Sequence, residues 1–102
     1  MELKGSHYKL HEILAQMQSV ADMNLTRSAA LGIKELGMSQ SEALGVIQTL
    51  TRENAVKTMT THVDHKVWQD VYRSEWQGVQ LYIKFQLAKE YFVISFKERT
   101  DE

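Results

Sequence analysis

Apolar residues recur at helical spacing in the first half of the chain and alternate or cluster in short runs in the second half. The change falls near Thr51. Before it, one apolar stripe predicts a first helix over residues 9–21. Its members are Leu10, Ile13, Leu14, Met17 and Ala21.

Capping signals predict two further helices. The second is expected to begin after Asn24 or Thr26, because either side chain can accept a free backbone N–H of the first turn. Gly37 is expected to end it in the left-handed conformation. Ser39 and Glu42 form a capping box that opens the third helix, in which each side chain accepts an N–H from the other residue's backbone.

The second half of the chain predicts four strands, over residues 56–61, 67–73, 79–87 and 91–97. Residues 87–90 are expected to form a hairpin turn, and residues 74–78 a flexible connection. We therefore predict an α+β fold, with N-terminal helices packed on one face of a curved, mainly antiparallel sheet. The length is typical of one domain, spanning residues 1–102.

Alternation separates the last two predicted strands into an apolar and a polar face. The face expected against the helices carries Leu81, Ile83, Phe85, Phe92, Ile94 and Phe96. The opposite face carries Tyr82, Lys84, Gln86, Tyr91, Val93, Ser95 and Lys97. In the strand before them, side-chain volume favours Trp68 and Tyr72 in the core, which places Gln69 on the polar face; periodicity alone does not decide.

Lysines and a tyrosine on an open sheet face suit a polyanion, although antiparallel sheets commonly expose polar residues merely to water. The formal net charge of −1 gives no general basic footprint, so nucleic-acid binding would need a local basic patch. No apolar run approaches the roughly 20 residues of a membrane span, and the N-terminus lacks the apolar stretch of a signal peptide. We expect a cytoplasmic protein with no membrane partner.

The absence of cysteine excludes disulfides and thiolate chemistry. The histidines offer two candidate groups of metal ligands, His7 with His11, and His62, Asp64 and His65. Neither spacing is a recognised metal motif, so we expect no metal site and no cofactor. A metal-dependent hydrolase built on these histidines remains an alternative.

A series of sequence words resembles the MqsR toxins, which are small bacterial mRNA interferases. The words keep nearly constant spacing over residues 25–98, about three-quarters of the chain. They are LTRSA from Leu25, ELG from Glu35, KTMTT from Lys57, DH from Asp64, WQDVYR from Trp68, LYIK from Leu81 and VISFKE from Val93. The word WQDVYR followed by SFKE near the end of the chain is specific, whereas any one word alone is weak.

The resemblance implies a RelE-like fold and ribosome-independent endonucleolytic cleavage of single-stranded mRNA, with a preference for a triplet of the GCU type. It also implies inhibition of translation and growth until a cognate antitoxin, with a zinc-binding and a DNA-binding domain, neutralises the toxin. The family's active-site positions fall here on Lys57, Gln69, Tyr82 and Lys97. All four lie in predicted strands, and alternation places Tyr82 and Lys97 on the polar face without the resemblance.

Metal-free RNA cleavage needs a proton acceptor for the ribose 2′-OH, a donor for the leaving oxygen and positive charge at the phosphate. Lysine and tyrosine ordinarily titrate near pH 10, so crowding must lower one pKa if a lysine is the base. We expect either Lys57 or Lys97 to be that base and the other to hold the phosphate. Tyr82 would then be an acid or hydrogen-bond donor, and Gln69 a positioning donor.

Three further residues are expected to bind RNA or support the site: Lys84, His65 and Arg73. His65 belongs to a matching word, and histidine ordinarily titrates near neutrality, although a hydrogen-bonded turn histidine beside Asp64 is the more common explanation. The main alternative to the enzyme is a non-catalytic module that binds RNA or protein with the same basic sheet face.

Overall fold

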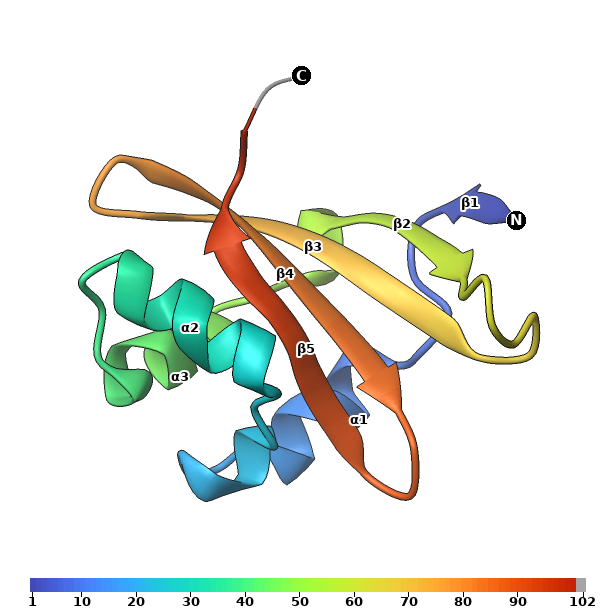
Figure 1. The fold of residues 1–102 in the computed structure, drawn as a ribbon, viewed down its shortest axis with the longest axis horizontal. Coiled ribbons are helices and arrows are strands. Elements are labelled where there is room, and N and C mark those ends of the chain that lie inside the picture. Colours follow the sequence, from blue (N-terminus) through green and yellow to red (C-terminus); the bar gives the residue numbers. More distant parts are fainter. Residues whose placement is uncertain (101–102) are drawn as a thin grey trace.

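Within residues 1–100, which the computed structural model describes, three helices pack on one face of a five-stranded antiparallel sheet (Figure 1). The helices are α1 (Leu10–Gln16), α2 (Arg27–Glu35) and α3 (Gln40–Gln48), and single 3-10 turns cover Ala21–Met23 and Arg52–Asn54. The strands are β1 (Glu2–Lys4), β2 (Ala55–Thr60), β3 (Trp68–Trp76), β4 (Val79–Leu87) and β5 (Tyr91–Glu98), and they follow chain order across the sheet. The predicted α+β class is confirmed. No helix of this part of the chain is both long and apolar enough to cross a membrane.

The predicted caps of α2 and α3 are confirmed. The Thr26 hydroxyl accepts the Ala29 N–H at 3.1 Å and donates to the Ile94 carbonyl at 3.0 Å, so this cap also ties α2 to β5. Gly37 ends α2 with a φ of +70°. Ser39 and Glu42 form both bonds of the capping box, at 2.9 and 3.0 Å.

The first helix ends at Gln16, earlier than its apolar stripe predicts. Two glutamine side chains account for the early end, because they form hydrogen bonds that tie the last turn of the helix to other elements. The Gln48 amide donates to the carbonyls of Leu14 and Met17. The Gln16 amide donates to the Tyr91 carbonyl at 2.7 Å and accepts its N–H at 2.8 Å. These bonds fix the end of α1 to α3 and to β5.

The core lies between the helices and the sheet, and α2 crosses β5 at close range. The largest fully buried side chains are Tyr72, Phe85, Phe96, Ile13, Met17, Met23, Ile33, Ile47, Leu81, Ile83, Val71 and Val93. Gly32 makes the close crossing possible, since a Cβ added there would lie 2.0 Å from the Phe96 carbonyl oxygen. Any residue other than glycine would therefore displace the helix or the strand.

The structure differs from the predicted strands in two places. The sequence did not predict β1, because three residues are too few to show alternation; Glu2 pairs with Met59 and Lys4 with Lys57. The predicted flexible connection over residues 74–78 was wrong. β3 instead continues to Trp76, and a two-residue turn with positive φ at Gln77 and Gly78 leads into β4, as expected for a tight hairpin.

The predicted faces of β5 were wrong over its first half, because the β4–β5 pair contains a bulge. Lys84 pairs with Ser95, but the next residue, Phe85, pairs with Val93. This shift turns Tyr91 and Val93 into the core, where they are 8% and 0% exposed. It places Phe92 on the polar face, opposite Gln86, and leaves Ile94 in the bulge. The predicted turn over residues 87–90 is confirmed.

Candidate functional site

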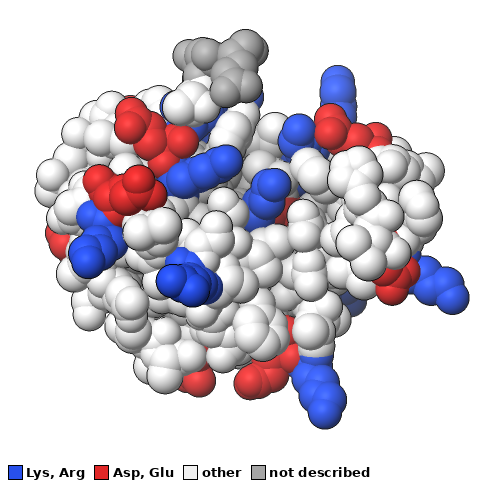
Figure 2. Space-filling model, viewed as in Figure 1, with Lys and Arg blue, Asp and Glu red and all other residues white. Residues whose placement is uncertain are grey.

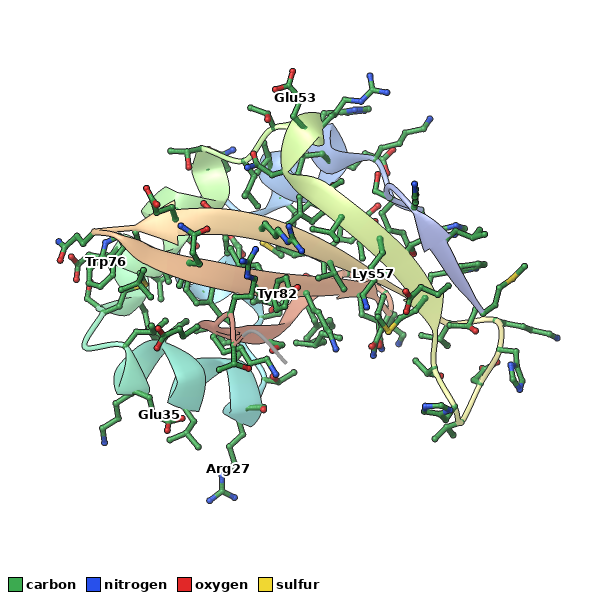
Figure 3. All side chains as sticks on the ribbon, turned by 90° about the horizontal axis from the view of Figure 1, so that it is seen from above. Arg27, Glu35, Glu53, Lys57, Trp76 and Tyr82 are labelled. Carbon is green, nitrogen blue, oxygen red and sulfur yellow. The ribbon has the colours of Figure 1, made fainter. Side chains whose placement is uncertain are left out.

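The sheet face opposite the helices, here called the polar face, carries side chains from all five strands. The strand register arranges them in three rows. The first row contains Lys4, Lys57, Val71, Lys84 and Ser95; the second contains Arg73, Tyr82 and Lys97; the third contains Glu2, Met59, Gln69, Gln86 and Phe92. Figure 3 shows Lys57 and Tyr82 over the middle of the sheet, whereas Arg27 and Glu35 project from α2 away from it. Lys57, Gln69, Tyr82, Lys84, Arg73 and Lys97 thus share one surface.

The orientation of β3 follows side-chain volume, as predicted. Tyr72 is fully buried in the core, which places Gln69 on the polar face. Asp70 is also fully buried on the helix side, where its carboxylate accepts the backbone N–H groups of His7 and Tyr8, each at 2.9 Å. Trp68 was predicted in the core but is only half-buried outside it, where its ring stacks on His7 with centroids 4.8 Å apart. The N-terminal segment therefore holds β3 in register beside Gln69.

Lys84 is the central cation of the polar face. Its pKa is lowered, first by burial and then by the positive charges of Lys97 and Lys57. The crowding of three lysines thus has the predicted effect on Lys84, a lysine that we did not consider for the base. Lys57 has a partner, because its Nζ lies 3.3 Å from the Glu2 carboxylate.

Positive charge is local rather than general on this protein. Acidic and basic side chains are interspersed over the side of the molecule seen in Figure 2. A basic strip on the polar face is therefore compatible with the net charge of −1. Any polyanion would be held by this strip and not by a wide basic surface.

Tyr82 occupies the centre of the second row. Its neighbour across the β4–β5 pair is Lys97, and its neighbour across the β3–β4 pair is Arg73. The Arg73 Nη2 donates to the Tyr82 hydroxyl oxygen at 3.5 Å, and the guanidinium carbon lies 5.8 Å from the ring centroid. Tyr82 therefore has a basic residue as its neighbour on each adjoining strand, Arg73 on β3 and Lys97 on β5.

Gln69 is held by a second glutamine. Its Nε2 donates to the Gln86 Oε1 at 2.9 Å, and both side chains are half-buried on the polar face. The bond leaves one N–H and the carbonyl oxygen of Gln69 for other partners. Gln69 can therefore offer a hydrogen bond from a fixed position.

The structure does not bring His65 to the polar face. It lies in the exposed loop between β2 and β3, outside the three rows. Among residues 1–100, no three His, Cys, Asp or Glu side chains lie together closely enough to hold a metal ion. His7, one of the candidate ligands, has its ring stacked on Trp68.

Sequence reasoning missed Glu2, Lys4 and Phe92 as members of the polar face. Glu2 and Lys4 enter with the unpredicted strand β1, and Phe92 enters through the bulge in β5. The only sequence signal for β1 is the polar pair at positions 2 and 4, which is too short to predict a strand.

Comparison with known proteins decides the family. Residues 5–98 match the family described as motility quorum-sensing regulator, toxin of MqsA. The chain belongs to the MqsR toxin family. Over 99 residues it is 34% identical to the mRNA interferase toxin MqsR of Escherichia coli K12. The aligned region covers 97% of this chain and all of that protein. The predicted resemblance is confirmed. The residues matched to the family, 5–98, contain β2 to β5 but not Glu2 or Lys4.

Proposed function

We propose that this chain is an endoribonuclease toxin that cuts mRNA without the ribosome and thereby inhibits translation and growth. The observation that carries the proposal is the gathering of Lys57, Gln69, Tyr82 and Lys97 on one sheet face in a member of the MqsR family. The E. coli relative is named an mRNA interferase. Lysines attract phosphates, and the phenol and the amide offer directed hydrogen bonds.

The proposed reaction is a transesterification within the RNA. The ribose 2′-oxygen attacks the adjacent phosphorus, the bond from phosphorus to the 5′-oxygen breaks, and the products are a 2′,3′-cyclic phosphate and a 5′-hydroxyl. The RNA supplies its own nucleophile, so the protein must move two protons and stabilise the charged phosphorane. No metal ion is required by this route.

We assign the roles with the rows of the polar face as a guide. Tyr82 and Lys97 are paired across β4 and β5, and we assign them to the leaving 5′-oxygen and the scissile phosphate. Gln69, fixed by Gln86, donates to a phosphate oxygen. Lys57 and Lys84 hold phosphate charge, with Arg73 supporting Tyr82.

The lowered pKa of Lys84 supports a role in binding phosphate. Burial and the charges of Lys97 and Lys57 disfavour the protonated amine. A phosphate placed among the three amines relieves that repulsion, so bound RNA stabilises the charged form of Lys84. RNA binding is therefore expected to weaken with salt, because phosphate contacts release counterions.

Two finer features belong to the same proposal. We assign a preference for a triplet of the GCU type, on the strength of the sequence words shared with the MqsR toxins. We also assign neutralisation by a cognate antitoxin that carries a zinc-binding and a DNA-binding domain. The description of the matching family as the toxin of MqsA supports an antitoxin partner.

The test uses three single-stranded RNAs in buffer with EDTA. One contains a single GCU, one has that triplet replaced, and one has the GCU with a 2′-deoxyribose at each of its positions. Cleavage of the first RNA alone, leaving a cyclic phosphate, supports the proposal. Cutting of the deoxy RNA would exclude 2′-OH attack, loss of activity in EDTA would favour a metal-dependent hydrolase, and binding without cutting would leave only an RNA-binding module.

A further inference from the structure

The polar face holds one carboxylate in direct contact with a proposed active-site lysine. Glu2 Oε2 lies 3.3 Å from Lys57 Nζ, and the two side chains are 60% and 35% exposed. β1 keeps Glu2 in place, because its backbone is paired along β2 and the Met1 amine donates to the Thr60 hydroxyl at 3.3 Å. Glu2 lies outside the residues matched to the MqsR family model.

Proton donors dominate the rest of the polar face. The ammonium groups of Lys57, Lys84 and Lys97 and the guanidinium of Arg73 donate hydrogen bonds and accept none. An ionised carboxylate has the opposite property, since it accepts hydrogen bonds and donates none. The proposed reaction needs a group that takes the proton of the 2′-OH, and Glu2 supplies this missing type of group beside Lys57.

Other carboxylates are less suitable for this task. Glu75 is on the same face but near the β3–β4 turn, where it accepts a bond of 2.7 Å from the Gln80 amide. Asp70 is fully buried on the helix side and bonded to two backbone N–H groups. Glu98 pairs with the core residue Leu81 and so belongs to the helix side of β5, and Glu35 projects from α2 away from the sheet (Figure 3).

We propose that Glu2 is the proton acceptor of the cleavage reaction, an inference that rests on the proposed function. The 2′-OH gives its proton to a Glu2 carboxylate oxygen as the 2′-oxygen forms its bond to phosphorus. The bond from phosphorus to the 5′-oxygen breaks, and that oxygen takes a proton from Tyr82 or Lys97. Water then exchanges both protons, which returns Glu2 to the carboxylate and the donor to its protonated form.

The ion pair gives this step a second effect. Before the reaction, the positive charge of Lys57 is paired with the Glu2 carboxylate. Once Glu2 has taken the proton it is neutral, and the full charge of Lys57 becomes available to the phosphorane. The stabilisation therefore grows as the transition state forms, which is the condition for a contact to accelerate the reaction.

The test compares Glu2→Gln with Glu75→Gln, a matched control that removes a carboxylate from the same face. Single-turnover cleavage of the GCU RNA by E2Q is expected to be roughly 100-fold slower or more, while E75Q stays within a few-fold of the unmodified protein. Affinity for the 2′-deoxy RNA should be unchanged or tighter in E2Q, because a negative charge is removed. Melting curves show whether both variants are folded.

The pH profile provides a second measurement. The charged groups around Glu2 are Lys4, Lys57 and the Met1 amine, all basic. The unmodified protein is expected to slow as pH falls and Glu2 takes a proton, and E2Q should lack this acidic limb. A folded E2Q that cuts as fast as the unmodified protein, or faster, would overturn the inference and reduce Glu2 to a counter-ion. Failure of the unmodified protein to cut would instead overturn the proposed function.

Discussion

Gln69 donates from its Nε2 to the Gln86 Oε1 at 2.9 Å, across the β3–β4 pair. This bond fixes which side of the Gln69 amide faces outward, because an amide has distinct donor and acceptor ends. An exposed glutamine would otherwise lose rotamer freedom on binding RNA. We therefore propose that Gln86 is a positioning residue, which contributes to cleavage through Gln69.

Replacing Gln86 tests this positioning role. Gln86→Leu removes the acceptor, and we expect cleavage to slow about 10-fold with little change in RNA affinity, since a misplaced catalytic contact mainly affects the reaction step. Gln86→Glu retains an acceptor for Gln69 but adds negative charge, so it should weaken RNA binding instead. Equal cleavage rates for Q86L and the unmodified protein would show that the Gln69 amide needs no partner.

Lys97→Ala is expected to abolish growth inhibition on induced expression and to slow RNA cleavage by roughly 100-fold or more, because it removes the cation beside Tyr82. Lys89→Ala is the matched control, since Lys89 is an exposed lysine in the turn between β4 and β5. Circular dichroism checks that both variants are folded. Toxicity retained by K97A would refute the assigned role.

Lys84→Met is expected to raise the melting temperature and weaken RNA binding at the same time. The lowered pKa means that the fold disfavours the charged amine, so at neutral pH an uncharged side chain of similar length removes a destabilising charge. One lost phosphate contact should reduce the salt dependence of binding, as the slope of log K against log salt, by about 0.7. A K84M variant that binds normally with an unchanged slope would remove Lys84 from the RNA path.

Asp70→Asn is expected to lower the free energy of unfolding by about 3 kcal/mol, measured by urea titration. The buried carboxylate accepts the N–H groups of His7 and Tyr8, and an amide turns one acceptor oxygen into a donor. Asp64→Asn is a suitable control, because the Asp64 side chain in the exposed loop accepts the Lys66 N–H, which an amide oxygen can also accept. Equal losses in both variants would contradict the assigned role of Asp70.

Tyr91 is expected to make stability fall in strongly alkaline solution. Burial, and then the hydrogen bond that its hydroxyl donates to Glu12, raise the pKa of Tyr91 to about 12. The fold therefore favours the protonated phenol, and this contribution is complete below pH 10 and lost as pH rises through 12. Between pH 9 and 11.5 the free energy of unfolding should fall less in Tyr91→Phe than in the unmodified protein. Equal falls would place the alkaline sensitivity elsewhere.

Local signals predicted the parts of the fold that depend on neighbouring residues. The capping box involves only Ser39 and Glu42, which are three residues apart in sequence. The end of α2 depends only on Gly37, which can adopt a positive φ because it has no side chain. The end of α1 was missed because it depends on Gln48, which is distant in sequence but adjacent in the fold. Hydrogen bonds between residues so far apart in the chain produce no periodic pattern in the sequence.

The candidate site shows the same division. Alternation alone placed Tyr82, Lys84 and Lys97 together, because β4 and the end of β5 are regular. It failed over Tyr91 and Val93, since one bulge residue reverses every side chain beyond it. Glu2 could not be found from the pattern at all, because its place on the polar face depends on pairing with a strand more than fifty residues away.

The close crossing at Gly32 offers a means of attenuating the toxin without altering its chemistry. A methyl group at position 32 must push against the Phe96 carbonyl, and the next residue along the strand is Lys97. The displaced strand would still carry every polar side chain, but its lysine would no longer meet Tyr82 in register. Gly32→Ala is thus a candidate for a conditional variant, one in which temperature controls whether Lys97 meets Tyr82.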